Sequence, residues 1–350
     1  MAIRIGISGW RYAPWRGVFY PTGLPQHLEL NYAAQRFSSI EINGSFYSLQ
    51  RPELFARWHA ATPHDFVFAV KGPRFITHML RLKEPETPLA NFLASGVLNL
   101  KAKLGPILWQ FPESLRYDRE RFATFLALLP RDTAGALCLA RRRNRELMQG
   151  RARLAIDENR PLRHAVEIRS ETFLNDDFLA LLRQHGTALV IAESAGRWPM
   201  PQDITADFVY LRLHGDEELY RSGYGDPALT RWAERIQAWH RGGEPRDATK
   251  IGASRPARHA RDVYCYFDNT DAKLRAPFDA EQLIAKLGGR GEELASGARD
   301  RLVRGRTPRS RSHVSPGAMA AVERAALVRP LHPPVPCNPT LSGCRWPPPG

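Results

Sequence analysis

Three short segments of the sequence alternate apolar residues with side chains suited to acid–base chemistry. The polar members of these segments are Glu41 and Asn43, then Glu167 and Arg169, then Tyr210, Arg212 and His214. Carboxylates and a histidine exchange protons near neutral pH, and guanidinium groups hold phosphates or developing oxyanions. The segments therefore predict an enzyme that carries out hydrolysis or proton transfer on a small anionic or phosphorylated substrate.

The carboxylates and the histidine are the candidate catalytic groups. We expect Glu41 to act as the general base and His214 as an acid or second base, with Glu167 and Glu193 as further carboxylates. Each also has a purely structural interpretation, because ion networks can close the end of a fold and buried histidines are often simply hydrogen-bonded. The set as a whole favours a functional site, since burying so many charges together is costly unless function retains them.

Substrate binding is assigned to polar and aromatic residues near the same segments. They are Trp10, Asn43, Phe46, Tyr47, Lys71, Gln110, Arg169, Arg212 and Asn269. The H-E-x-x-H spacing is missing from the sequence, as are a P-loop, a dinucleotide-binding fingerprint and a nucleophile elbow. The sequence therefore assigns no metal site and identifies no cofactor.

A nucleic-acid-binding protein, with or without nuclease activity, is the alternative function. The formal net charge is +14, although residues 289–350 carry ten arginines against four acidic residues. The loops after the first two strands combine aromatics with arginines, a composition that can stack bases and hold phosphates. These residues are Trp10, Arg11, Tyr12, Trp15, Arg16, Phe46, Tyr47 and Arg51. The competing interpretation is that the aromatics fill loops, which makes a small anion the favoured partner.

Eight short β-rich runs position these residues. They span residues 3–8, 39–43, 66–71, 106–110, 165–169, 188–193, 208–214 and 263–269. Helical spacing fills most of the gaps, as in residues 52–61, 118–129, 175–185, 227–240 and 279–287. Alternating strands and helices indicate parallel βαβ units, and eight such units over about 290 residues predict an α/β fold, the (β/α)8 TIM barrel.

Side chains two apart share a face of a strand, so the polar residues of each segment face one way. In a barrel the apolar face meets the outer helices, and the polar face points inward. The polar residues also come late in their strands, joined by Ser8, Lys71, Gln110, Glu193 and either Asp268 or Asn269. Barrel enzymes assemble their sites at this C-terminal rim, so we expect the site there.

The chain as a whole indicates a cytoplasmic protein that does not enter the membrane. No run of about 18 apolar residues occurs, and the first ten residues resemble a strand rather than a signal peptide. The four cysteines include no C-x-x-C pair, which disfavours a disulfide framework and a zinc site and fits a reducing compartment. No feature of the sequence fixes an oligomeric state.

Composition divides the chain near residue 288. Residues 1–288 form the expected barrel domain, whereas residues 289–350 contain ten prolines and a single aromatic, Trp346. Such a composition cannot bury enough apolar surface to offset its ordering entropy, so we predict a disordered basic tail. Residues 242–261 are expected to form a loop insertion between a helix and a strand.

Seven segments together resemble the YecE-like family, the domain of unknown function 72. They are residues 9–21 (GWRYAPWRGVFYP), 41–47 (EINGSFY), 68–71 (FAVK), 105–112 (GPILWQFP), 164–169 (HAVEIR), 210–215 (YLRLHG) and 266–270 (YFDNT). The resemblance implies a TIM-barrel-like fold and supplies no activity. The positions it carries over are Trp10, Glu41, Asn43, Phe46, Tyr47, Lys71, Gln110, Glu167, Arg169, Arg212, His214 and Asn269. Glu193 departs from the pattern, which has aspartate there, and the tail and the insertion look foreign to it.

Overall fold

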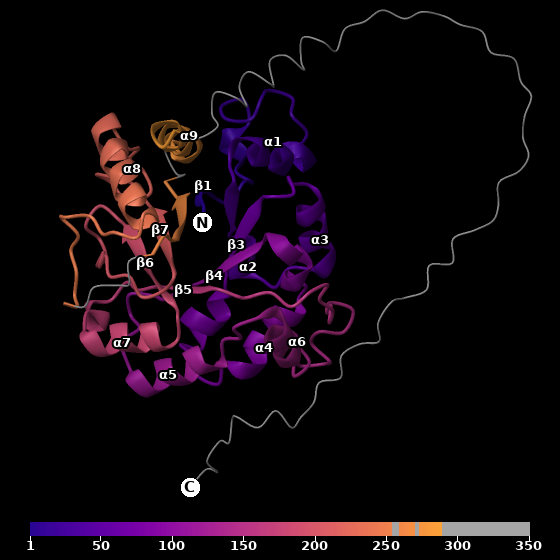
Figure 1. Ribbon diagram of the computed structural model, residues 1–350. Helices are drawn as coiled ribbons and strands as arrows, with labels where there is room; N and C mark the ends of the chain where they lie inside the picture. Colours follow the sequence, from indigo (N-terminus) through magenta and orange to yellow (C-terminus); the bar gives the residue numbers. More distant parts are fainter. Residues whose placement is uncertain (254–258, 270–272, 289–350) are drawn as a thin grey trace, which may run out of the picture. The chain divides into compact units, whose positions relative to one another are not determined.

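Eight parallel strands close into a barrel in a computed structural model of the chain, which describes residues 1–253, 259–269 and 273–288 (Figure 1). The strands follow one another around the barrel in chain order, and the last pairs with the first through Ile3–Val263 to Ile7–Phe267. Their bounds are β1 Ile3–Ser8, β2 Ser39–Ile42, β3 Val67–Lys71, β4 Leu104–Gln110, β5 His164–Glu167, β6 Ala188–Glu193, β7 Phe208–Leu213 and β8 Asp262–Phe267.

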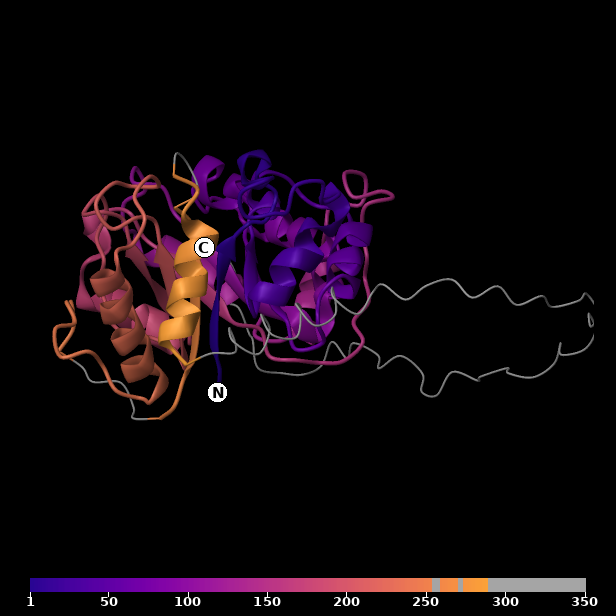
Figure 2. The ribbon, with the colours of Figure 1, turned by 90° about the horizontal axis from the view of Figure 1, so that it is seen from above.

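Helices surround the barrel and bury their apolar faces against the outer side of the strands (Figure 1). The α-helices are α1 Glu29–Arg36, α2 Gly44–Tyr47, α3 Pro52–Ala60, α4 Glu86–Ala94, α5 Arg119–Leu128, α6 Thr133–Ala140, α7 Asp176–Gln184, α8 Asp226–His240 and α9 Ala276–Lys286. Turns of 3-10 or π helix lie at Ala13–Trp15, Gln26–Leu28, Phe75–Met79, Val97–Lys103 and Glu171–Phe173. In the turned view of Figure 2, α9 lies beside β1, which it contacts.

The expected TIM barrel is confirmed, with strand ends that differ from the expected ones by one or two residues. All five expected helices occur as α3, α5, α7, α8 and α9. Helices α1, α2, α4 and α6 go beyond them. Two of these have weak periodicity in the sequence: α6 reads TAGALCLA, which is almost wholly apolar, and α4 contains Pro88.

The barrel interior is filled mostly by small residues and tyrosines. Alternate positions of each strand point inward, and they include Ala69, Leu108, Ala165, Ala188, Val190, Ala192, Phe208, Tyr210, Tyr264 and Tyr266. Close strand packing requires glycine at position 6, because a Cβ there would lie 1.8 Å from the carbonyl oxygen of Ser39 on β2. A tightly filled floor of this kind confines any ligand to the mouth of the barrel.

Two further expectations concern the ends of the chain and its irregular segments. The described part of residues 242–261 forms a loop between α8 and β8, as expected. The predicted disordered tail, residues 289–350, lies outside the described residues. Of the helices that the structure describes, none is both long and apolar enough to cross a membrane.

Candidate functional site

Arg212 lies at the centre of the barrel mouth, fully buried, and joins carboxylates from three other strands or strand ends. Its guanidinium donates to both oxygens of Glu41, at 2.9 and 3.1 Å. It also donates to Glu167 Oε2 at 2.8 Å and to Asp268 Oδ2 at 2.7 Å. We call Arg212, these carboxylates, Ser8 and Tyr210 the Arg212 network. It ties β2, β5, β7 and the end of β8 together across the barrel.

Glu41 is held from every side within this network. Ser8 Oγ donates to its Oε1 at 2.7 Å, and Tyr210 OH donates to its Oε2 at 2.6 Å. The residue has no exposed surface. The carboxylate therefore serves as a structural anchor for Arg212, with both oxygens already occupied.

The remaining carboxylates of the network are ionised. Burial alone would raise the pKa of Glu167, but Arg212 and Arg169 hold it well below the usual range. Burial likewise opposes the charge on Asp268, and Arg212 nevertheless holds its pKa at about 2. Both groups are therefore negative at neutral pH, and each faces a cation: Arg212 contacts both, and Arg169 adds a second contact to Glu167.

His214 is neutral and has a defined tautomer. Its Nε2 lies 3.3 Å from Nη1 of Arg212, which is only a donor, so Nε2 accepts and Nδ1 carries the proton. Nδ1 lies 3.3 Å from Asp268 Oδ2, but the two are too misaligned for a well-formed hydrogen bond. Burial and then the charge of Arg212 lower the pKa of His214, which keeps the ring uncharged.

Arg169 connects the Arg212 network to the surface. Its Nε donates to Glu167 Oε1 at 3.0 Å, and its Nη2 donates to Tyr220 OH at 3.3 Å. The guanidinium carbon lies 3.5 Å from the centre of the Trp198 ring, close enough for a strong cation–π contact. Among the described residues Nη1 has no hydrogen-bond partner, so Arg169 keeps a donor available at the barrel mouth.

A cleft of about 700 Å³ opens above the network. A volume of this size suits a small molecule. It is lined by Gly9, Trp10, Arg11, Tyr12, Ile42, Asn43, Gly44, Phe46, Tyr47, Gln50, Trp58, Lys71, His78, Gln110, Arg169, Tyr220 and Asp268. Aromatic side chains and a few convergent polar groups make up this lining, a composition typical of ligand sites.

One side of the cleft carries a buried amine, and we call Asn43, Phe46, Lys71, His78 and Gln110 the Lys71 wall. Lys71 ends β3 on the inward face, two residues after Ala69, and is 8% exposed. Its Nζ lies 4.1 Å from the centre of the Phe46 ring. Within the described part of the chain this ammonium has no hydrogen bond or ion pair. Burial and then Arg212 lower the pKa of Lys71 to about 8.

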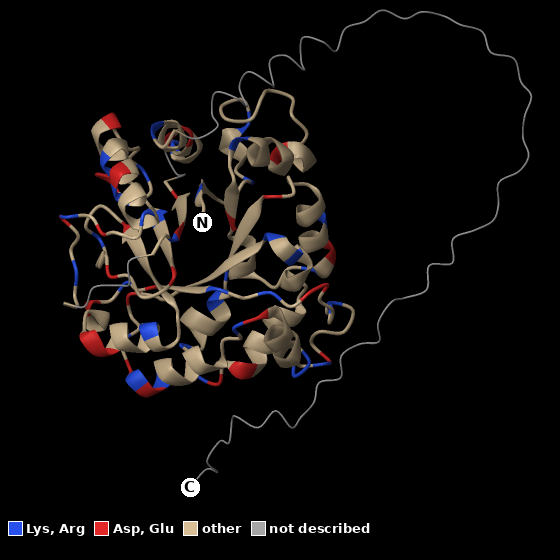
Figure 3. Ribbon diagram, viewed as in Figure 1, with Lys and Arg blue, Asp and Glu red and all other residues tan. Residues whose placement is uncertain are grey.

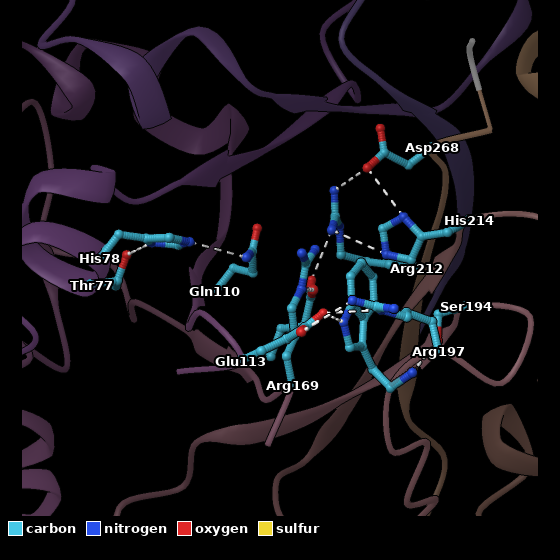
Figure 4. Close-up of polar contacts among 12 residues, drawn as sticks. Thr77, His78, Gln110, Glu113, Arg169, Ser194, Arg197, Arg212, His214 and Asp268 are labelled. Carbon is cyan, nitrogen blue, oxygen red and sulfur yellow. Dashed lines mark hydrogen bonds and ion pairs between the residues drawn. The ribbon is translucent and has the colours of Figure 1, made fainter. Parts of the chain in front are cut away.

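His78 and Gln110 line the same cleft as that amine, and both Lys71 and His78 contact the Phe46 ring. Gln110 Nε2 lies 3.4 Å from His78 Nε2, and His78 Nδ1 lies 2.8 Å from Thr77 Oγ1. An amide nitrogen only donates, so His78 Nε2 accepts and Nδ1 holds the proton. Burial, Lys71 and Arg169 lower the pKa of His78 to about 4, so the ring is neutral. Figure 4 shows Gln110 between His78 and the cluster of Arg212, His214 and Asp268.

The structure gathers most of the residues predicted for the site. Glu41, Glu167, Arg212 and His214 meet in or beside the Arg212 network. Seven others line or adjoin the cleft: Trp10, Asn43, Phe46, Tyr47, Lys71, Gln110 and Arg169. Their catalytic and binding roles stay predictions.

Glu193 and Asn269 do not join them. Along β6 the residues Ala188, Val190 and Ala192 face inward, so Glu193 faces the outer helices, where it bonds to Trp232. Along β8 Tyr264 and Tyr266 face inward, which selects Asp268 for the site. The amide of Asn269 instead donates to Ser222 O and Asp279 Oδ2 on the outer side. We therefore replace Asn269 by Asp268 and remove Glu193 from the site.

The sequence also missed Trp198, Tyr220 and His78. Trp198 follows β6 and covers Arg169, and Tyr220 follows β7 and bonds the same guanidinium. His78 lies in the π-helical turn after β3. Only their position in loops after strands signalled them, since loops at the C-terminal ends of barrel strands build the site.

The aromatic loops are packed rather than presented to solvent. Trp10, Trp15 and Phe46 are each less than 9% exposed, and Trp10 meets Trp58 edge to face. Tyr47 is the exception at 70% exposed. In the view of Figure 3, positive and negative residues are mixed on the outer helices. The described residues thus form a packed aromatic cleft rather than an open stacking platform.

The chain is similar to proteins of one family. The profile of a family described as "Protein of unknown function DUF72" matches residues 4–302, past the expected domain boundary at residue 288. The UPF0759 protein YecE of Escherichia coli K12 is 31% identical over 127 residues, which are 32% of this chain and 44% of that protein. The protein of the same name from Escherichia coli O157:H7 matches equally. The match therefore spans less than half the length of these relatives.

Solved structures support the fold. A DUF72 family protein (TM1631) from Thermotoga maritima MSB8 superposes with a TM-score of 0.61 at 23% identity, covering 82% of this chain and 100% of that chain. A DUF72 family protein (EF0366) from Enterococcus faecalis V583 gives 0.56 at 16% identity, covering 82% and 95%. At these identities the likeness concerns the barrel alone.

Proposed function

The chain belongs to the DUF72 family, and from that premise we propose that its cleft is the active site of an enzyme that moves a proton on a small anionic substrate. One observation carries the proposal. Two cations that line the cleft keep N–H donors available. Lys71 has no hydrogen-bonding partner among the described residues, and the Nη1 of Arg169 has none there either. Buried cations are normally paired, so Lys71 without an ion pair and Arg169 with a spare donor are candidates for holding an anion.

The two cations suit different roles. Arg169 carries a planar guanidinium fixed by Glu167, Tyr220 and Trp198, so it is suited to hold a carboxylate or phosphate. The pKa of Lys71, about 8, lets this amine exchange protons close to neutral pH, whereas His78 stays neutral there and can hydrogen-bond the substrate. Aromatic side chains of the cleft, Trp10 and Phe46, enclose the apolar part of the substrate.

Glu41 takes a different role from the general base that its sequence position suggests. Both of its oxygens are bound within the network, and it is fully buried beneath the cleft. We assign it to positioning, since it orients Arg212, which in turn engages Glu167 and lowers the pKa of Lys71. His214 shares this supporting position beside Arg212 and Asp268.

The test is ligand-induced stabilisation of the full chain. Thermal unfolding is followed with inorganic phosphate, pyrophosphate and glycerol phosphate, with potassium chloride as the ionic-strength control. A ligand at a hundred times its dissociation constant adds about 2.7 kcal/mol to the stability of the folded state. We expect at least one phosphate compound to raise the Tm and the change Arg169→Gln to remove that shift.

Arg119→Gln is the matched control. Arg119 begins α5 and pairs with Asp177 at the surface, and it lines neither the cleft nor the hollow beside Arg169 and Trp198. The phosphate shift should survive this change. A shift that Arg169→Gln leaves intact, or a shift produced only by DNA or RNA oligomers and lost at high salt, would overturn the proposal.

A further inference from the structure

Two buried lysines of this chain have opposite environments. Lys103 is 5% exposed and donates to the carbonyl oxygens of His59 and Thr62, at 2.5 and 2.8 Å, and to Thr62 Oγ1 at 3.1 Å. Lys71 is as well buried, but its nearest defined contact is the face of Phe46. Lys103 uses its three ammonium protons for structure, whereas the Lys71 nitrogen remains available to a ligand in the cleft.

We propose that the Lys71 amine forms an imine with the carbonyl carbon of a small anionic aldehyde or ketone bound in the cleft. This inference rests on the proposed function, whose substrate class it narrows from any small anion to a carbonyl compound. It follows from the geometry of the cleft: a nitrogen nucleophile on its wall and an anion-holding guanidinium in its lining.

The Arg212 network is the reason that no carboxylate neutralises Lys71. Glu41 is saturated by Ser8, Tyr210 and Arg212. Glu167 gives one oxygen to Arg169 and the other to Arg212. Asp268 gives its Oδ2 to Arg212 and forms no ion pair with Lys71 among the described residues. The charged form of Lys71 is therefore left to an aromatic face, which stabilises it far less than a salt bridge would at such a buried position.

The depressed pKa of Lys71, about 8, agrees with this environment. A neutral amine is the nucleophile in imine formation, and burial next to another cation is a known way to produce one. The pKa of an ordinary lysine is 10.5, so at a given pH near neutrality Lys71 is neutral far more often.

The step balances without any redox partner. The lone pair of Nζ attacks the carbonyl carbon, the carbon–oxygen π bond opens, and a proton passes from nitrogen to oxygen to give a carbinolamine. The carbon–oxygen single bond then breaks and water leaves with the carbonyl oxygen and both amine hydrogens. The carbon–nitrogen double bond remains. The polar groups that line the same cleft, Gln110 and neutral His78, are placed to hold the oxygen during this exchange.

The experiment is reductive trapping on the full chain. The protein is incubated with glycolaldehyde phosphate, an aldehyde that carries a phosphate, and the imine is reduced with sodium borohydride to a stable secondary amine. Peptide mass spectrometry then compares the extent of modification at three lysines of the same molecule. They are Lys71, the paired and buried Lys103, and the exposed Lys83.

We expect Lys71 to be modified on the order of tenfold faster than Lys83, and Lys103 to stay unmodified. Glycerol phosphate, which has no carbonyl group, should compete with the probe. Arg169→Gln should slow trapping at Lys71 without slowing it at Lys83. Lys71→Arg keeps the charge and should abolish the fast phase.

Two results would overturn the inference, and they have different meanings for the cleft. If Lys71 reacts no faster than Lys83 while phosphate still raises the Tm through Arg169, the imine is wrong and the anion site stands. If Lys71 does not react and phosphate has no effect, both the imine and the proposed function are wrong.

Discussion

The two ends of the barrel differ in how their buried charged side chains are paired. At the N-terminal end, Arg163 precedes β5 and pairs with Asp262 at 2.6 Å and Asp207 at 3.1 Å, and Lys103 precedes β4 with three hydrogen bonds. At the C-terminal end, Arg212 is just as fully paired, but Lys71 is not. Paired charge is therefore common to both ends, and unpaired buried charge distinguishes the mouth.

This contrast separates stability from function within one cluster. A fully paired buried network fixes geometry, and removing one member leaves uncompensated charge. An unpaired buried cation does not stabilise the fold, because its burial costs free energy. Such a group is expected to be kept for function rather than for stability. The mouth thus has a structural half, the Arg212 network, and a functional half, the Lys71 wall.

The largest expected effect comes from removing the centre of the paired half. Arg212→Met leaves Glu41, Glu167 and Asp268 without their shared cation and should cost about 3–5 kcal/mol of unfolding free energy. Lys71→Met is the matched change in the other half, and it should cost no stability because it removes an unpaired buried charge. Urea denaturation of both variants measures the difference. Equal losses of unfolding free energy in the two variants would contradict the division into a structural and a functional half.

Acid should weaken the paired half next. The pKa of Asp268 falls from 3.8 to about 2 on folding, so its contribution is complete above about pH 4 and is lost as the pH falls through 2. Its size is about 2 kcal/mol. In Asp268→Asn this part of the acid dependence should disappear, as followed by denaturation between pH 2 and 6 in wild type and variant. An unchanged acid profile would show that Asp268 is not held by Arg212.

Tyr210→Phe removes one hydrogen bond to Glu41 and leaves the ion pair intact. We expect a loss of about 1–2 kcal/mol, because a buried carboxylate oxygen loses a donor. Tyr264→Phe is the control on the neighbouring strand, since its hydroxyl lies 3.4 Å from Arg163 and forms only a weak hydrogen bond. The Tm of Tyr210→Phe should be clearly lower than the Tm of Tyr264→Phe. The reverse order would contradict the role of Tyr210 in the Arg212 network.

The smallest effect should come from the support of Arg169. Trp198→Leu removes the ring that covers its guanidinium and should weaken phosphate binding by about 0.5–1 kcal/mol, roughly two- to fivefold. Isothermal titration of both proteins measures this change. Affinity that stays constant would show that Trp198 does not position Arg169.

Strand alternation predicts most of this arrangement, and two of the errors arose where it was not applied. The alternating pattern of the sequence places Glu41, Glu167 and Arg212 on the inward faces of their strands, where the barrel has them. Applied to the other strands it would have directed Glu193 outward and chosen Asp268 over Asn269, because Ala192 and Tyr266 face inward. The resemblance to the family named Asn269 instead, which shows that a family pattern can mark structural as well as site residues.

The loop residues were beyond sequence reasoning for a different reason. Tyr220 reaches Arg169 from a backbone with φ of 61°, and Trp198 does so from a loop without regular structure. No periodicity encodes such positions. The saturation of Glu41 was equally unreadable, since it depends on which of several donors the closed barrel brings to one carboxylate.

The most direct test of the account is a titration of Lys71 itself. The lysines of the full chain are reductively methylated with a ¹³C label, which keeps them basic, and their NMR signals are followed from pH 6 to pH 11. Lys71→Met identifies the Lys71 signal by its loss. The account predicts one lysine that titrates near pH 8 and is missing from the variant. If every lysine titrates near its ordinary pKa of 10.5, the Lys71 wall holds no unusual amine and the division of the barrel mouth is contradicted.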